Sequence, residues 1–134
     1  MGLQRVWILR LSAKNRTQED LDYLHANIEK LKVTDDVAEE GIIDRNFHSR
    51  IAEASGNPVV SLMVDPIFRL MPRIKAMIYA EVDAAKGIAL EFHQKIYNTI
   101  KDQDGEGAFE AMHAHLEIAV EHTSQVTEFI MHKE

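Results

Sequence analysis

The stretch from His93 to His115 constrains the fold most, because it reads as two helical arms joined by a short turn. Apolar residues recur on both arms at the three- and four-residue spacing of one helix face. These residues are Ile96, Tyr97, Ile100, Ala108 and Met112. The turn at residues 102–105 contains two Asp and a Gly, and Asp104 is a suitable N-cap for the second arm. The stretch therefore predicts an antiparallel helical hairpin.

The histidines at the two ends of this hairpin are expected at the same height. His93 lies about nine residues before the turn and His115 about ten after it. At the rise of an α-helix, each histidine is therefore about 14–15 Å from the turn along its helix axis. Both histidines also belong to the faces that carry the apolar residues, and these are the faces that meet. Two imidazoles that point inward at the same height indicate two of the ligands of a metal site.

The rest of the chain predicts four further helices, which makes six in all. The expected segments are residues 4–14, Thr17 to about Leu31, Thr34 to the turn at Ser55, 58–80, 84–101 and 105–132. Pro66 and Pro72 are expected to bend the fourth helix. No strand-like alternation, internal repeat or linker interrupts the pattern. We therefore expect one all-α domain over residues 1–134, folded as an antiparallel bundle of six to seven helices.

Capping residues mark several of these helix ends. Thr17 and Asp20 have the spacing of a capping box, and Thr34 is a candidate cap for the third helix. Gly56 suits the left-handed position after the third helix, and Asn57 suits the N-cap of the fourth. On the third helix we assign an inner and an outer face. The inner residues are Val37, Ile42, Phe47 and Ile51, and the outer ones are Glu39, Glu40 and Arg45.

Composition excludes several classes of function. The formal net charge of −7 has no compensating basic face, so the chain is not expected to bind nucleic acid by itself. There is no cysteine, so a metal must be held by histidine and carboxylate. No run approaches the ~20 apolar residues of a membrane span, and the opening residues do not make a convincing signal peptide. We expect a cytoplasmic protein without membrane contact.

The third helix adds two more candidate metal ligands. Asp44 and His48 are four residues apart, about 40° around a helix, so their side chains can converge. A surface Asp–His pair is the alternative, but His48 is flanked by apolar residues that indicate the edge of a core. Together with His93 and His115 the set contains one carboxylate and three imidazoles. Such a set suits zinc, nickel, manganese or iron better than calcium, which prefers oxygen ligands.

Other polar residues are weighed separately. His113 lies about 200° from His115 on a helix and is expected to face solvent. His122 returns to the face of His115, where it either lines a cavity beside the metal or is simply packed. Arg73 and Lys75 lie near the expected bend of the fourth helix. Either can assist an anion, although solvated basic residues are the common case.

Three segments resemble the FCD domain, the C-terminal ligand-binding domain of FadR-type regulators in the GntR family. They are DRNFHSRIAEASGNPVV (44–60), FHQKIYNTIKDQD (92–104) and AFEAMHAHL (108–116). Each motif alone is weak, but their order and gaps fit the family, and the resemblance covers nearly the whole chain. One departure is Phe92, which stands where the family commonly has Glu before the histidine.

The resemblance implies a helical bundle that holds a divalent metal, most plausibly zinc or nickel, and a small carboxylic-acid effector. The implied metal ligands are Asp44, His48, His93 and His115, and the effector contacts considered are Arg73 and His122. A homodimer is expected, because the first helix is apolar on most sides and the fourth is rich in Met and Leu. The family normally has a winged helix-turn-helix domain before this one. We expect DNA contact only through such a domain, which is absent from residues 1–134.

The sequence therefore predicts the effector-sensing domain of a GntR/FadR-type transcriptional regulator and not an enzyme. Two alternatives stay open. A dimerisation or structural module that has lost sensing would keep the fold without the ligands. A metal-dependent hydrolase or oxygenase would use the same ligand types, but it also needs a general base, for which only His122 or a stray Glu is available.

Overall fold

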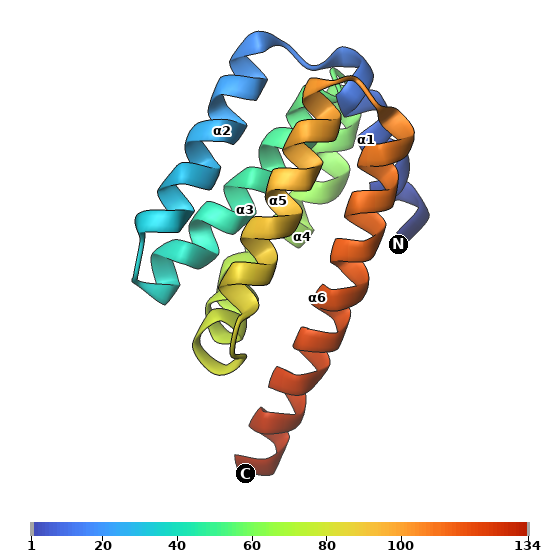
Figure 1. The fold of residues 1–134 in the computed structure, drawn as a ribbon. Helices are drawn as coiled ribbons and strands as arrows, with labels where there is room; N and C mark the ends of the chain where they lie inside the picture. The colour runs from blue at the N-terminus through green and yellow to red at the C-terminus, as the bar shows by residue number, and fades with distance from the viewer. Residues whose placement is uncertain (1, 134) are drawn as a thin grey trace.

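Six α-helices run antiparallel to one another in the computed structural model, which describes the backbone of residues 2–133 and the side chains of residues 8–128 (Figure 1). The helices are α1 (Gly2–Asn15), α2 (Gln18–Val33), α3 (Val37–Ala54), α4 (Pro58–Glu81), α5 (Ala85–Lys101) and α6 (Gly105–Lys133). No strand occurs within residues 2–133, so the prediction of an all-α bundle is confirmed. The last turns of α6 extend beyond the other helices (Figure 1).

Most of the predicted helix caps are present. The Thr17 hydroxyl accepts a hydrogen bond from the Asp20 amide at 3.1 Å, and the Asp20 carboxylate accepts one from the Thr17 amide at 2.9 Å. The side chains of Asn57 and Asp104 accept hydrogen bonds from amides two and three residues further on, each at 3.0 Å. Gly56 has a φ of 76°, the left-handed conformation expected of it.

The predicted start and inner face of the third helix are wrong in its first turns. Thr34 ends α2, where its hydroxyl donates to the Lys30 carbonyl at 2.7 Å, and α3 begins at Val37. Ile42 is 43% exposed, whereas Glu40 is 4% exposed and lies 2.8 Å from the Lys86 ammonium of α5. The reason is geometric, because residues five apart on a helix point about 140° away from each other. Ile42 therefore cannot share a face with Phe47, and Val37, also exposed, cannot share one with Ile42.

The core is one large cluster with two smaller clusters beside it. The large cluster joins α1, α2, α3, α5 and α6 through Leu9, Leu24, Ile28, Phe47, Ile51, Ile96, Ile100 and Met112. The second packs α4 against α1 and α3 through Ile8, Ala52, Val60 and Val64. The third closes the opposite end through Ile78, Ala85 and Val126. Helix α3 is thus covered by neighbours along its length, and polar groups on its inner face are removed from water.

Helices α3 and α4 approach closely at Gly41. A Cβ atom added at Gly41 would lie 2.3 Å from the carbonyl oxygen of Pro72, so only glycine fits there. Pro66 and Pro72 both lie inside α4, and the expected bend of this helix stays a prediction. The close contact brings the next two turns of α4, with Lys75 and Tyr79, against the next turn of α3, with Asp44.

Candidate metal centre

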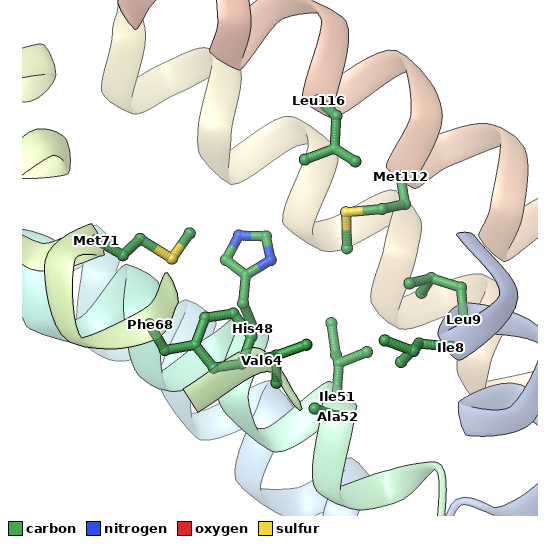
Figure 2. A pocket seen from close by; sticks show the side chains of 10 residues that line it. All are labelled: Ile8, Leu9, His48, Ile51, Ala52, Val64, Phe68, Met71, Met112 and Leu116. Atoms are coloured by element: carbon green, nitrogen blue, oxygen red, sulfur yellow. The ribbon is translucent and has the colours of Figure 1, made fainter. Parts of the chain in front are cut away.

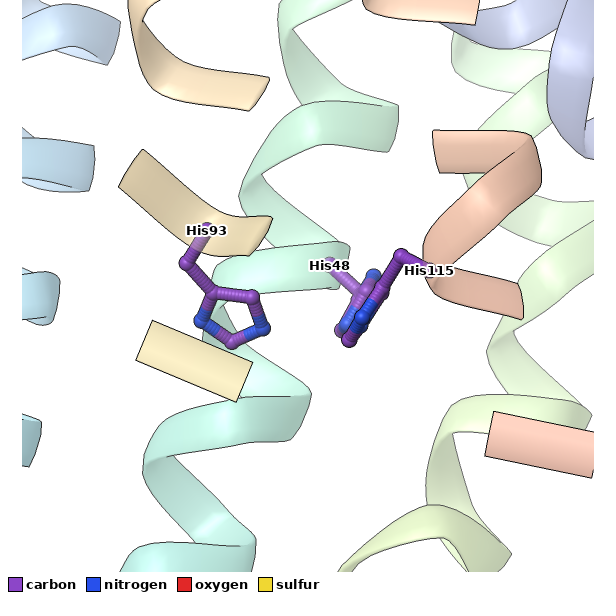
Figure 3. A group of neighbouring side chains, drawn as sticks. All are labelled: His48, His93 and His115. Atoms are coloured by element: carbon purple, nitrogen blue, oxygen red, sulfur yellow. The ribbon is translucent and has the colours of Figure 1, made fainter. Parts of the chain in front are cut away.

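Three histidines from three helices meet in the middle of the bundle. His48 comes from α3, His93 from α5 and His115 from α6 (Figure 3). Their ring centroids are 5.2–5.5 Å apart, and one nitrogen of each ring lies within 4.8 Å of the others. The helical hairpin therefore brings His93 and His115 to one level, as their distances from the turn predict.

Asp44 lies beside this group and is fully buried. Its Oδ1 atom is 3.3 Å from the Nε2 atom of His48, one helical turn further along α3. Ligand atoms about 2.0–2.2 Å from one cation lie roughly 3.0–3.5 Å from each other at tetrahedral or octahedral angles. The Asp44–His48 pair already has this separation, which is the arrangement expected of two neighbouring ligands.

The ring nitrogens of His93 and His115 are buried without hydrogen-bond partners. Both nitrogens of each ring are inaccessible to water and form no hydrogen bond within the described residues. Leaving a buried polar group unsatisfied costs about 1–3 kcal/mol, and such groups are rare in folded proteins. A neutral imidazole gives a cation one of its two nitrogens, so a cation between the rings would explain one buried nitrogen of each ring.

Burial sets the protonation of these histidines. It lowers the pKa of His93 to about 3, against a partly opposing effect of the Asp44 carboxylate. Burial also lowers the pKa of His115, and His93 and His48 reinforce that effect. Both rings are therefore neutral at pH 7, which is the form that binds a metal.

Asp44 stays ionised despite its burial. Burial by itself raises the pKa of a carboxyl group. Lys75 and the neighbouring imidazoles outweigh it and hold the pKa of Asp44 well below its usual range. The neutral rings of His93 and His115, the His48 ring and the Asp44 carboxylate beside it together make a donor set that fits zinc, nickel, manganese or iron.

Two residues of α4 hold the other side of Asp44. The Tyr79 hydroxyl donates a hydrogen bond to Asp44 Oδ2, and the Lys75 ammonium lies 3.9 Å from the same oxygen. From the sequence, Lys75 was considered as an anion contact, whereas Tyr79 was not predicted. Their spacing of four residues, which puts both side chains on one face of α4, was the available signal. Phe47 completes the surroundings, because its ring stacks on His93 with centroids 4.0 Å apart.

Two pockets reach the histidines from the side of α4. The smaller, about 30 Å³, lies beside His48 among the apolar side chains drawn in Figure 2. The larger, about 460 Å³, is an open pocket between α4 and α6 that His48, His115 and Lys75 line together. His122 lines a third, very small pocket with Tyr79 and His115.

The remaining predicted residues lie further out. Arg73 is exposed and lines none of these three pockets. His113 is exposed on the outer face of α6, where it pairs with Glu117 at 2.7 Å, which confirms the predicted helix phase. Among the described residues, no helix is long and apolar enough to cross a membrane.

Comparison with known proteins adds independent evidence. A family model described as the FCD domain matches residues 6–118. The chain is 29% identical over 110 residues to the uncharacterized HTH-type transcriptional regulator YcbG of Bacillus subtilis, and 27% identical over 114 residues to the HTH-type transcriptional repressor NanR of Klebsiella aerogenes. Each alignment covers 81% of this chain but only 45% and 43% of the relatives. The chain therefore spans less than half the length of these two regulators.

Solved structures show the same fold. A GntR-family transcriptional regulator from Pseudomonas syringae superposes with a TM-score of 0.80 at 21% identity, over 95% of this chain and 54% of that one. McbR/YncC of E. coli superposes with a TM-score of 0.70 at 20% identity, over 96% and 61% of the two chains. The three relatives described by function are transcriptional regulators and not enzymes, in agreement with the sequence prediction.

Proposed function

Because the chain belongs to the FCD domain family, we propose that it is the effector-sensing domain of a GntR/FadR-type transcriptional regulator. Its site would hold a divalent metal, with zinc or nickel as the proposed ion, through Asp44, His48, His93 and His115. The observation that carries the proposal is the convergence of three buried rings, whose nearest nitrogens lie within 4.8 Å of one another, while those of His93 and His115 have no hydrogen-bond partner among the described residues. A cation is the group that satisfies neutral imidazoles and a buried carboxylate at the same time.

A bound divalent cation supplies a local charge of about +1 and a coordination position for an oxygen donor. A small carboxylic acid is therefore the proposed effector. Lys75 adds a second positive charge on the pocket side of Asp44, and the α4–α6 pocket provides access from solvent. His122, in the small neighbouring pocket, is a more distant contact, and Arg73 is too exposed to be a main one.

The ligand set also explains how binding would be transmitted. Asp44 and His48 belong to α3, His93 to α5 and His115 to α6, while α4 joins the group through Tyr79. Ligands that bind one arrangement of these helices better than another shift the equilibrium between them. A winged helix-turn-helix domain attached to the bundle would read that shift as a change in DNA affinity. We place such a regulator in the cytoplasm.

A homodimer is part of the proposal. On the first half of α4, Val59, Leu62 and Met63 are 58%, 75% and 56% exposed. Large apolar side chains that cluster on a surface mark interaction sites more often than scattered ones do. In contrast, the described part of α1 is already packed in the core through Ile8 and Leu9. The earlier residues of α1, also considered for this interface, have side chains outside the described residues.

Metal titration tests the proposal. Purified protein stripped with a chelator should bind about one equivalent of zinc or nickel in calorimetry, and its melting temperature should rise with metal concentration by mass action. His93→Ala and His115→Ala should each remove most of this metal-linked rise. His113→Ala is the matched control on the outer face of α6, and it should keep it. A folded wild-type protein with no metal affinity would favour a dimerisation module that has lost sensing.

A further inference from the structure

The α4–α6 pocket has a polar end and a long apolar wall. The polar end is formed by Lys75 together with His48 and His115, two of the four proposed metal ligands. The wall consists of Ile67, Leu70, Met71, Ile74, Leu116, Ala119 and Val120. Met71 and Leu116 lie on either side of the His48 ring, as Figure 2 shows, so the apolar wall begins directly at the histidine. The volume of about 460 Å³ is within the range of small-molecule sites.

Away from the polar end, the pocket offers few groups that recognise polar substituents. Thr123 and Ser124 are the polar residues of the far part. The Thr123 hydroxyl donates its proton to the Ala119 carbonyl at 2.7 Å, so it has no proton left for a ligand. Among the residues whose side chains the structure describes, no Arg, Asn or Gln lines this pocket. A second carboxylate or a row of hydroxyls would therefore lose water without gaining hydrogen bonds, which is costly.

We infer that the effector is a monocarboxylic acid with an apolar tail of about four to eight carbons. The carboxylate would lie at the end formed by His48, His115 and Lys75, where the local charge is positive. The tail would lie along the apolar wall between α4 and α6. This inference rests on the proposed function, because it specifies which carboxylic acids the same site takes.

The apolar wall predicts a dependence on chain length. Each methylene that is fully buried improves binding about fourfold at 25 °C, and a half-open groove should realise about two- to threefold. Affinity should therefore rise from acetate to butyrate to hexanoate to octanoate. Adipate and gluconate have the six carbons of hexanoate, but they carry a second carboxylate and five hydroxyls, respectively. Both should bind at least tenfold more weakly than hexanoate.

The experiment titrates zinc-loaded protein with this series of acids in calorimetry. Val120→Asn places an amide on the wall of the pocket and should flatten the increase from butyrate to octanoate. Val33→Asn is the matched control, because Val33 is 81% exposed at the end of α2 and lines no part of the pocket. Zinc binding is measured for both variants, so that loss of the fold would be recognised.

The outcomes separate this inference from the proposed function. Tight binding of adipate or gluconate, or affinity independent of chain length, would overturn the apolar-tail inference and leave a carboxylate sensor. Zinc binding without affinity for any of the acids would overturn the carboxylate sensor as well. An increase with chain length that Val120→Asn flattens and Val33→Asn preserves would support both.

Discussion

At the scale of single residues, Asp44 connects the parts of the candidate site. One oxygen lies 3.3 Å from His48 Nε2, and the other accepts the hydrogen bond of Tyr79. A carboxylate held on one oxygen presents the other in a defined direction. In the proposed metal site, Tyr79 would therefore be a positioning residue that acts on the metal through Asp44, in the way that outer partners of metal ligands generally act.

Tyr79→Phe tests this role. The variant keeps the ring and removes the hydroxyl, so it should weaken zinc binding about tenfold, the lower range for loss of such a partner. Affinity is measured by competition with a chromophoric chelator. Tyr23→Phe makes the same change on an exposed ring of α2 and should leave affinity unchanged. Equal affinities of the Tyr79 variant and the wild type would show that Asp44 needs no support from α4.

The buried histidines predict a pH dependence of the metal-free protein. The pKa of His93 is about 3 in the folded chain, against about 6.5 when unfolded. Between these values the unfolded chain binds more protons, so stability is complete above about pH 6.5 and falls as the pH falls through this window. His115 acts in the same direction, and the lowered pKa of Asp44 adds to the loss below about pH 4.

Thermal unfolding in the presence of a chelator, followed between pH 7.5 and 4.5, should show this decrease in melting temperature. The double variant His93→Leu/His115→Leu removes both groups and should show a shallower decrease over the same range. A wild-type melting temperature that stayed constant from pH 6.5 to 4.5 would contradict the lowered histidine pKa values. Zinc affinity should weaken in parallel on acidification, because protons compete for the same nitrogens.

At the scale of elements, the contact between α3 and α4 determines where the groups on α4 lie. Gly41 allows the Pro72 carbonyl to approach the backbone of α3, and Lys75 and Tyr79 follow within two turns of α4. A side chain at position 41 would push the two helices apart. The neighbourhood of Asp44 therefore depends on a residue that has no functional group of its own.

Gly41→Ala should destabilise the protein by about 1–3 kcal/mol, the usual cost of forcing extra atoms into a packed contact. Gly87→Ala is the matched control, because a Cβ atom at Gly87 in α5 meets nothing within 4 Å. That variant should be neutral or more stable by up to about 1 kcal/mol, since alanine favours a helix over glycine. Urea denaturation measures both. Equal stabilities of the two variants would mean that α4 can move away from α3 at little cost.

At the scale of the whole molecule, the exposed apolar side chains on the first half of α4 predict self-association. Sedimentation velocity at tens of micromolar should show a dimer. Leu62→Arg introduces a charge into the exposed group and should shift the equilibrium towards monomer. Val33→Arg, at a similarly exposed position on α2, should not. A wild-type chain that sediments only as a monomer would contradict the proposed α4 interface.

Features that depend on nearby residues were predictable from the sequence. The capping box at Thr17, the caps at Asn57 and Asp104 and the left-handed Gly56 all involve groups within four positions of each other. The level of His93 and His115 follows from helix rise alone, once the turn between them is recognised. The all-α class and the outward direction of His113 follow from the same periodicity.

Features that depend on which helices pack together required the tertiary structure. The burial of Glu40 reflects its ion pair with Lys86, which is 46 residues further along the chain. Hydrophobicity alone had placed Glu40 on the outer face of the third helix. Tyr79 reaches Asp44 across 35 residues because α4 packs closely on α3 at Gly41. The α4–α6 pocket likewise has no counterpart in local sequence. The sequence by itself determined the helices and most of their ends and predicted the four candidate ligands, because these follow from short-range geometry and motif. Only the packing of α4 decided what surrounds those ligands, because contacts between distant segments depend on the shapes of both partners.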